Sequence, residues 1–331
     1  MTFRWTSRLV AVAAVALALG GCASAAQSAP EGAAAETRVF TGDNGEVTVP
    51  AHPQRVVATG YAVPALIEVG APLVGISTWT RGVPLMSPEE LSTYEGLDKV
   101  AGESAADTNY EAIALAKPDL IVIGVPAPVL ADVDVERLST LAPVVAIGPT
   151  IPSAWREISR RHADAAGALA GFDAVRAEYE AKAAELKAKY AGVVPQLKFG
   201  HVGAYGQITD GTFQREFNGS WGTNVAQDVG ANYYGAVKNP GPGSKAVSEY
   251  SSMEEIGGSL READAITYSV NPDGSVPASV QRVLDSELWK NLPAVQAGRA
   301  FPVRYTEAAT YSAALKTLDA VDAAFGPLLT P

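Results

Sequence analysis

The chain has 331 residues, of which 47% are hydrophobic, and its formal net charge at pH 7 is −11. A chain of this length can form two domains of ordinary size, each with its own core. The negative charge and the lack of a Lys/Arg cluster exclude a typical nucleic-acid-binding protein, because phosphate binding requires a basic face.

The first segment of the chain has the pattern of a secretory signal. Arg4 and Arg8 precede an apolar run over residues 9–19 that is too short to span a bilayer as a mature helix. The only cysteine, Cys22, directly follows Leu-Gly-Gly and resembles the bacterial lipobox, in which the thiol is lipidated and the chain is cut just before it. We therefore expect a signal peptide over 1–21 and a lipid anchor at Cys22 that holds the protein on the extracytoplasmic face of the cell membrane. The alternative is an ordinary cleaved signal with an incidental cysteine.

Residues 22–37 are small or polar and without periodicity, so they predict a lipidated flexible tether. Because Cys22 is the only cysteine, the sequence offers no internal disulfide. Lipidation of Cys22 would also exclude a cysteine nucleophile.

The first half predicts an α/β lobe over 38–152. Arg38–Phe40 and Val47–Val49 flank Asn44-Gly45, a dipeptide typical of hairpin turns. Apolar runs without polar alternation then alternate with helical patterns, as expected for parallel strands covered on both faces. These runs are 56–58, 73–76, 120–123 and 144–147.

A helical connection and a second α/β lobe follow. Residues 153–190 contain no proline and predict helix with a break near Gly171. The second half repeats the alternation, with strands expected over 196–202, 265–268 and 300–303, helices over 221–229, 253–260 and 276–284, and a last helix over 308–325. We therefore expect two α/β lobes, 38–152 and 171–331, joined by a helix over 153–170. A ligand would bind beyond the strand ends, in the cleft between the lobes.

The sequence carries no motif that indicates an enzyme. A nucleophile elbow, a P-loop, a dinucleotide fingerprint and a His-Glu-x-x-His zinc motif are all missing from it. Its three histidines, His52, His162 and His201, are dispersed and lack the spacing of metal ligands. We expect a protein without catalytic activity and without a metal site of its own.

Aromatic residues and arginines follow the predicted strands, where they would line the cleft. Flat aromatic faces and guanidinium donors suit a large, oxygen-rich, partly anionic ligand. For Trp221, which precedes an apolar helical pattern, packing in the core is an equally good interpretation. The candidate residues are Tyr61, Trp79, Arg81, Tyr205, Phe213, Arg215, Trp221, Arg304 and Tyr305.

The order of several segments resembles one family. The chain from about Arg38 to the C-terminus is similar to the ferric-siderophore, haem and cobalamin class of ABC-transporter substrate-binding proteins. The segments that carry the resemblance are VTVPAHPQRVV (47–57), LIEVGAPLVG (66–75), YEAI (110–113), KPDLI (117–121) and LWKNLPAVQAGR (288–299).

The resemblance implies two Rossmann-like lobes, a single rigid connecting helix and limited closure around the ligand. It also implies a monomer that delivers its ligand to a membrane permease, and through it to an ATPase. The permease would receive one carboxylate from each lobe. The matching residue is Glu254 in the second lobe, whereas in the first lobe Asp98 stands where the family has glutamate and Glu95 lies one turn earlier. Surface carboxylates without a partner are the alternative for these residues.

A ferric siderophore is the first choice of ligand within the family. A hexadentate siderophore already saturates Fe(III) with oxygen donors, so the protein needs to recognise only the outside of the chelate. Haem is the second choice, with Tyr205, Tyr305 or His201 as axial ligand, and cobalamin is the third. A surface sensor without a transport partner and a secreted hydrolase remain as alternatives from other classes.

Overall fold

The computed structural model describes residues 36–329, so Cys22, the signal peptide and most of the tether lie outside the described part. The described chain begins with the expected hairpin, in which β1 (Thr37–Gly42) pairs antiparallel with β2 (Gly45–Pro50). No helix within residues 36–329 is both long and apolar enough to cross a membrane.

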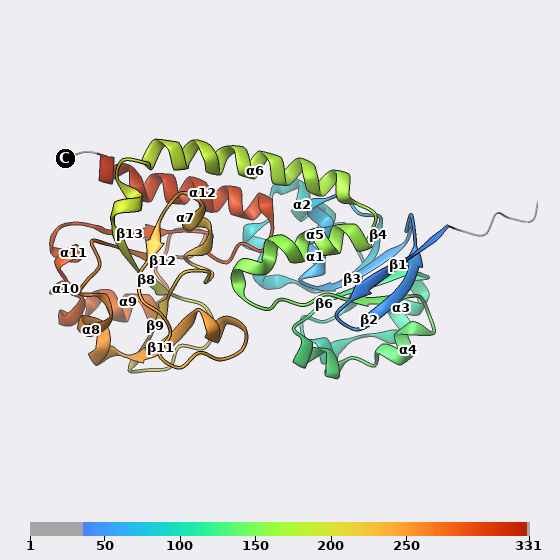
Figure 1. The fold of residues 1–331 in the computed structure, drawn as a ribbon. Coiled ribbons are helices and arrows are strands. Elements are labelled where there is room, and N and C mark those ends of the chain that lie inside the picture. The colour runs from blue at the N-terminus through green and yellow to red at the C-terminus, as the bar shows by residue number, and fades with distance from the viewer. Residues whose placement is uncertain (1–35, 330–331) are drawn as a thin grey trace, which may run out of the picture. The chain divides into compact units, whose positions relative to one another are not determined.

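The first lobe is built on a five-stranded parallel sheet of order β5-β4-β3-β6-β7, flanked by short helices (Figure 1). The four apolar runs predicted from the sequence are strands of this sheet. Its elements are β3 (Val56–Gly60), α1 (Ala62–Glu68), β4 (Leu73–Ser77), α2 (Pro88–Gly96), β5 (Lys99–Ala101), α3 (Tyr110–Ala116), β6 (Leu120–Gly124), α4 (Val135–Ser139) and β7 (Val144–Ala146).

The second lobe is built on a mixed sheet of order β11-β9-β8-β12-β13, with β10 also paired to β8. Strands β8, β10, β12 and β13 pair in parallel, whereas β9 pairs antiparallel with both of its neighbours, β8 and β11. The elements are β8 (Lys198–Gly203), β9 (Thr212–Glu216), α7 (Asn224–Asp228), β10 (Asn232–Tyr233), β11 (Ser248–Ser252), α8 (Ile256–Leu260), β12 (Ala265–Ser269), α9 (Ala278–Asp285), α10 (Glu287–Lys290), α11 (Pro293–Gln296) and β13 (Ala300–Val303).

The connection between the two sheets is not the single helix that the sequence predicted over 153–170. The chain forms α5 (Trp155–Ala165), turns at Gly167 with a φ of +68°, and continues as α6 (Leu169–Tyr190). The break predicted near Gly171 occurs at Gly167, a few residues earlier, and Gly171 itself lies in the first turn of α6. A side chain there would bring a Cβ within 2.5 Å of the Val69 carbonyl oxygen, so glycine permits close packing of α6 on the first lobe.

The last helix, α12 (Tyr311–Phe325), packs beside α6 over the second lobe, and its N-terminal end reaches the junction with the first lobe (Figure 1). Although α12 follows the second lobe in sequence, its first turns hold the first lobe. Lys316 donates hydrogen bonds to the carbonyl oxygens of Leu85 and Met86 at 2.9 and 2.7 Å, and the Ser312 amide donates to the carboxylate of Glu68. Both α6 and α12 therefore brace the two lobes.

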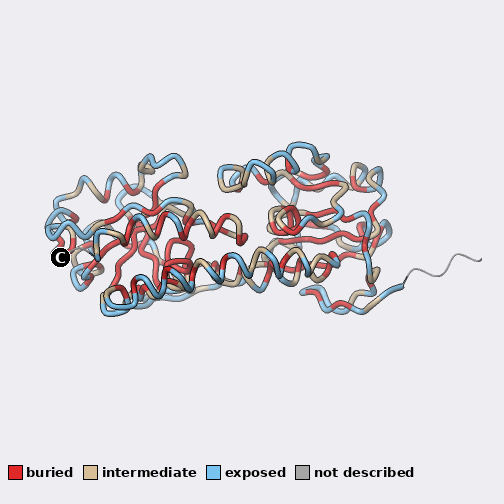
Figure 2. The backbone as a smooth tube through the Cα atoms, turned by 90° about the horizontal axis from the view of Figure 1, so that it is seen from above, coloured by how far each residue is buried: buried red, intermediate tan, exposed pale blue. Residues whose placement is uncertain are grey.

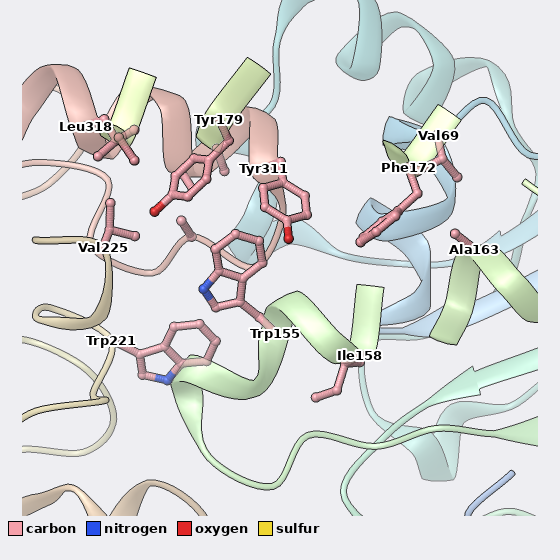
Figure 3. Packing of buried hydrophobic residues seen from close by; sticks show 14 of the residues in the cluster. Val69, Trp155, Ile158, Ala163, Phe172, Tyr179, Trp221, Val225, Tyr311 and Leu318 are labelled. Carbon is pink, nitrogen blue, oxygen red and sulfur yellow. The ribbon is translucent and has the colours of Figure 1, made fainter. Parts of the chain in front are cut away.

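One hydrophobic core runs beneath these helices and contains residues of both lobes. Figure 3 shows the indole of Trp155, on α5, with Tyr311 and Tyr179 on one side and Trp221 on the other. The ring centroids of Trp155 and Tyr311 lie 4.8 Å apart with an edge-to-face angle of 71°. On the opposite face of each sheet lies a smaller core that belongs to one lobe alone. In Figure 2 the buried segments run through both lobes and along the helices that face them.

Candidate functional site

A pocket lies between the lobes, at the carboxyl ends of strands β3, β4, β8 and β13. Parallel strands expose the loops that follow them at one edge, which is where open α/β sheets bind ligands. The pocket encloses about 550 Å³ of empty space, part of it open to solvent. Its lining is Tyr61, Pro64, Ile67, Trp79, Arg81, Gly82, Leu85, Met86, Glu90, Tyr205, Trp221, Glu307, Ala309, Thr310 and Ala313.

The first lobe contributes an aromatic wall that carries a cation. Tyr61 and Trp79 pack edge to face with ring centroids 4.9 Å apart. The guanidinium carbon of Arg81 lies 4.0 Å from the Trp79 ring centroid and 4.7 Å from that of Tyr61, which are cation–π distances. Gly82 lets this loop approach, because a Cβ there would fall 2.1 Å from Nε1 of Trp79. The Trp79 amide donates to the hydroxyl of Tyr94 at 2.9 Å and fixes the start of the loop.

The second lobe contributes the facing aromatic wall. The ring of Trp221 is parallel to that of Tyr61, with centroids 6.4 Å apart, and is tilted against Tyr205 at 5.8 Å. Trp221 lies in the turn before α7 and is 5% exposed, yet its indole Nε1 has no hydrogen-bond partner among the described residues. Tyr205 follows β8 and its amide donates to the side chain of Gln214 at 2.8 Å. The pocket therefore offers flat apolar faces from both lobes.

Charge and protonation of the lining follow from its burial. Burial raises the pKa of Tyr61 to about 12, with the Arg81 charge acting in the opposite direction, so this phenol stays neutral and can donate a hydrogen bond at pH 7. Desolvation also raises the pKa of Glu307, again against Arg81. Glu90 is engaged by the Ser87 amide at 2.7 Å and by the hydroxyl of Ser312.

The structure thus brings Tyr61, Trp79, Arg81, Tyr205 and Trp221 into one pocket, as the sequence predicted. It does not bring in the other candidates from the second lobe. Phe213 and Arg215 were expected on a loop, but both lie in β9 and are buried in the sheet. The Arg215 guanidinium donates to the carbonyl oxygens of Glu216 and Tyr234 and has no part in the lining.

Arg304 and Tyr305 follow β13 as expected but lie outside the pocket lining. Tyr305 has a φ of +58°, a left-handed conformation that turns the chain directly after the strand. Its carbonyl oxygen accepts a hydrogen bond from Thr317 at 2.6 Å, which holds the turn. The turn leaves Arg304 exposed over the Tyr305 ring, and Glu307 reaches the pocket instead.

The residues that the sequence analysis missed have three origins. Pro64 and Ile67 lie on α1. Leu85, Met86 and Glu90 belong to the same loop and helix as Arg81, and Glu307, Thr310 and Ala313 lead into α12. The only available signal was their position downstream of a strand end, because aliphatic residues and single carboxylates carry no motif.

The candidate docking carboxylates lie on the surface. Glu95 is exposed at the end of α2, and Asp98 is exposed in the segment that follows α2. Glu254 is exposed in the turn between β11 and α8, where its amide donates to Ser252 Oγ at 3.4 Å. No ion pair involves these carboxylates within residues 36–329.

Several known proteins are similar to this chain in sequence and fold. Iron(3+)-hydroxamate-binding protein YxeB of Bacillus subtilis is 27% identical over 272 residues, which cover 80% of this chain and 77% of YxeB. The siderophore periplasmic binding protein from the fuscachelin gene cluster of Thermobifida fusca is 28% identical and superposes with a TM-score of 0.67, covering 85% of this chain and 99% of that one.

Staphylococcus aureus SirA, solved in complex with staphyloferrin B, shares the fold at 20% identity, with a TM-score of 0.66 over 88% of this chain and 99% of SirA. The two-lobed α/β fold expected from the sequence is thereby confirmed. The profile of the family described as periplasmic binding protein matches residues 56–304, most of the chain. The chain therefore belongs to the periplasmic binding protein family.

Proposed function

We propose that this protein captures a ferric siderophore outside the cytoplasm and delivers it to an ABC importer for iron uptake. The observation that carries the proposal is the pocket itself, in which aromatic residues and an arginine from opposite halves of the chain meet around about 550 Å³. The names of the Bacillus subtilis and Thermobifida fusca relatives support the same class of ligand.

The lining suits the outside of a chelate. The rings of Tyr61, Trp79 and Trp221 can pack against its apolar parts, and Arg81 can donate to its oxygen atoms. The iron would keep the oxygen donors of the siderophore, because a hexadentate chelator leaves no coordination site for the protein to fill.

The geometry favours a siderophore over haem. His201, a candidate axial ligand, is fully buried in β8, and its ring nitrogens lie 2.7 Å from Thr267 Oγ1 and 3.1 Å from Ser269 Oγ. Tyr305 does not line the pocket, so Tyr205 is the only one of the proposed axial ligands in the lining.

Further features complete the proposal. A lipid on Cys22 would anchor the protein to the cell membrane and keep it near the permease and its ATPase. The exposed carboxylates Glu254 and either Asp98 or Glu95 would dock on that permease. We propose a monomer without enzymatic activity, since its task is to bind and release.

The test is a titration of tryptophan fluorescence in the soluble domain that starts after Cys22. Ferric hydroxamate, ferric catecholate, hemin and cobalamin are added separately, and Trp79→Phe is compared with Trp289→Phe. Trp289 is buried in the core of the second lobe alone, so it serves as a matched control. Saturable quenching by a ferric chelate that Trp79→Phe weakens and Trp289→Phe does not supports the proposal, whereas saturation by hemin alone overturns it.

Two variants refine the assignment of roles. Arg81→Ala is expected to weaken an anionic chelate more than a neutral one, because charge-assisted hydrogen bonds contribute about 1.5 to 3 kcal/mol each. Glu254→Ala is expected to reduce cellular uptake while leaving affinity unchanged. If affinity falls in parallel with uptake, Glu254 is not a docking residue.

A further inference from the structure

Two side chains of opposite charge lie in the pocket lining without ion-pair partners. Arg81 lies over aromatic faces and Glu307 approaches from the segment before α12. Within residues 36–329, no ion pair joins Arg81 and Glu307 to each other or to any other residue. The pocket therefore has a positive pole from the first lobe and a negative pole from the second.

The two carboxylates of the lining differ in what they do for the fold. Glu90 completes the capping box of α2 with Ser87 and also accepts from Ser312 on α12, so its oxygens hold elements together. Glu307 accepts no hydrogen bond from the described residues and its side chain is exposed at the pocket. Of the two, Glu307 is the one that is available to a ligand.

A carboxylate in a partly desolvated cleft lowers its free energy by meeting a cation. An ammonium group supplies both the opposite charge and the hydrogen-bond donors that an unpaired carboxylate can bind. Arg81 could serve as this partner, but its guanidinium is held over Trp79 and Tyr61 and is not within ion-pair distance of Glu307.

We propose that Glu307 binds a cationic group, an ammonium, at the periphery of the ferric chelate, so that the pocket selects a chelate with this group over the same chelate without it. Arg81 then faces the oxygen-rich part of the same ligand. This inference rests on the proposed capture of a ferric siderophore and adds the charge of the ligand to it.

The experiment compares two ferric trihydroxamates that differ only in this group. One is the ferric complex of deferoxamine, which carries a free ammonium, and the other is the ferric complex of N-acetylated deferoxamine, which does not. Fluorescence titrations are made with the natural protein, with Glu307→Gln and with Glu185→Gln. Glu185 is an exposed carboxylate of α6 outside the pocket, so its variant controls for the change in net charge.

The natural protein and Glu185→Gln are expected to bind the ammonium chelate about tenfold more tightly than the acetylated one, which is the factor that 1.4 kcal/mol of interaction produces. Glu307→Gln is expected to remove this preference by weakening the ammonium chelate alone, and added salt should reduce the preference in the natural protein. Thermal unfolding of each variant verifies that it is folded.

Equal affinity of the natural protein for the two chelates would overturn the role of Glu307 and leave siderophore capture standing. A preference that survives in Glu307→Gln would also overturn it. Absence of binding by either chelate, together with binding of hemin, would overturn this inference and the proposed function together.

Discussion

The two lobes hold their pocket residues by different physical means. In the first lobe, the strands behind Tyr61 and Trp79 are apolar, and β6 is buried along its whole length. In the second lobe, β9 buries Gln214, Arg215 and Glu216, each at most 1% exposed. Hydrophobic contacts do not depend on a fixed direction, whereas a buried polar group must meet its hydrogen-bond partner in a defined geometry.

The polar interior of the second lobe reaches the pocket through the turn that carries Trp221. The Glu216 carboxylate accepts a hydrogen bond from the amide of Gly222 at 2.6 Å, directly beside Trp221. Burial raises the pKa of Glu216 to about 7. One wall of the pocket is therefore positioned by hydrophobic contacts and the other by a buried hydrogen-bond network.

The core that the lobes share provides the largest expected effect. Trp155→Ala removes an indole that is 3% exposed and packs against Tyr311, so we expect a loss of about 3 to 5 kcal/mol in the free energy of unfolding. Urea denaturation followed by far-UV circular dichroism measures it. Trp289→Ala makes the same change in a core that belongs to the second lobe.

Hydrogen exchange distinguishes the two tryptophan variants. Trp155→Ala should speed exchange in β3 and β8 together, whereas Trp289→Ala should affect the second lobe first. Equal and global effects of both variants would contradict the distinction between a shared core and a core of one lobe.

The polar interior of the second lobe gives the next largest effect. Arg215→Ala leaves the carbonyl oxygens of Glu216 and Tyr234 without their donor and opens a cavity. We expect a loss of about 3 kcal/mol in the free energy of unfolding, measured by urea denaturation. Arg304→Ala, an exposed arginine of the same lobe, should change stability by less than about 0.5 kcal/mol. Similar effects of the two variants would show that the β9 network contributes little.

A pH dependence tests the contact between α12 and the first lobe. The pKa of Glu68 is raised from its usual 4.5 to about 8, mainly by burial. Nearby Glu90 acts in the same direction, whereas hydrogen bonds from Ser312 act in the opposite direction. Between these pH values the folded protein holds a proton that the unfolded chain has released. The contribution of Glu68 to stability is therefore fully present below pH 4.5 and is lost as the pH rises through 8.

Glu68→Gln imitates the protonated side chain at every pH. Relative to the natural protein, this variant should gain about 3 kcal/mol between pH 5 and pH 8 in urea denaturation. Glu111→Gln, at an exposed position on α3, should show no such change. A constant difference between Glu68→Gln and the natural protein at all pH values would mean that Glu68 is charged in the folded state.

The smallest effect concerns Lys316, whose ammonium holds the carbonyl oxygens of Leu85 and Met86. Lys316→Ala should lower the free energy of unfolding by about 1 kcal/mol and weaken ligand binding, because both residues line the pocket. Lys187→Ala, an exposed lysine near the end of α6, is the control. Unchanged binding by Lys316→Ala would show that the loop keeps its position without α12.

The sequence predicted the first lobe more fully than the second, for a physical reason. Continuous apolar runs are the direct signature of covered parallel strands, so β3, β4, β6 and β7 were recognised. Strands β9 and β11 have the polar sequences TFQRE and SEYSS, and their burial depends on tertiary partners that no local pattern reveals.

The pocket residues, too, could be predicted only where they directly follow an apolar strand. Tyr61, Trp79 and Arg81 directly follow apolar strands, so their placement at the sheet edge could be inferred from order alone. Arg215 has the residue type expected for an anionic ligand, but its strand turns it into the interior. Because of the left-handed turn at Tyr305, Glu307 lines the pocket and Arg304 does not. The sequence around Tyr305 contains no glycine that would indicate such a turn.

The position of α12 sets the order in which the protein can be completed. The lobe that is synthesised first lacks the helix that donates a hydrogen bond to Glu68 until residues 311–325, among the last to be made, have been added. A chain that stops before Tyr311 contains both sheets, yet the carbonyl oxygens of Leu85 and Met86 lack Lys316 and the ring of Trp155 lacks Tyr311. An incomplete chain therefore exposes apolar surface of the shared core that α12 covers in the finished protein.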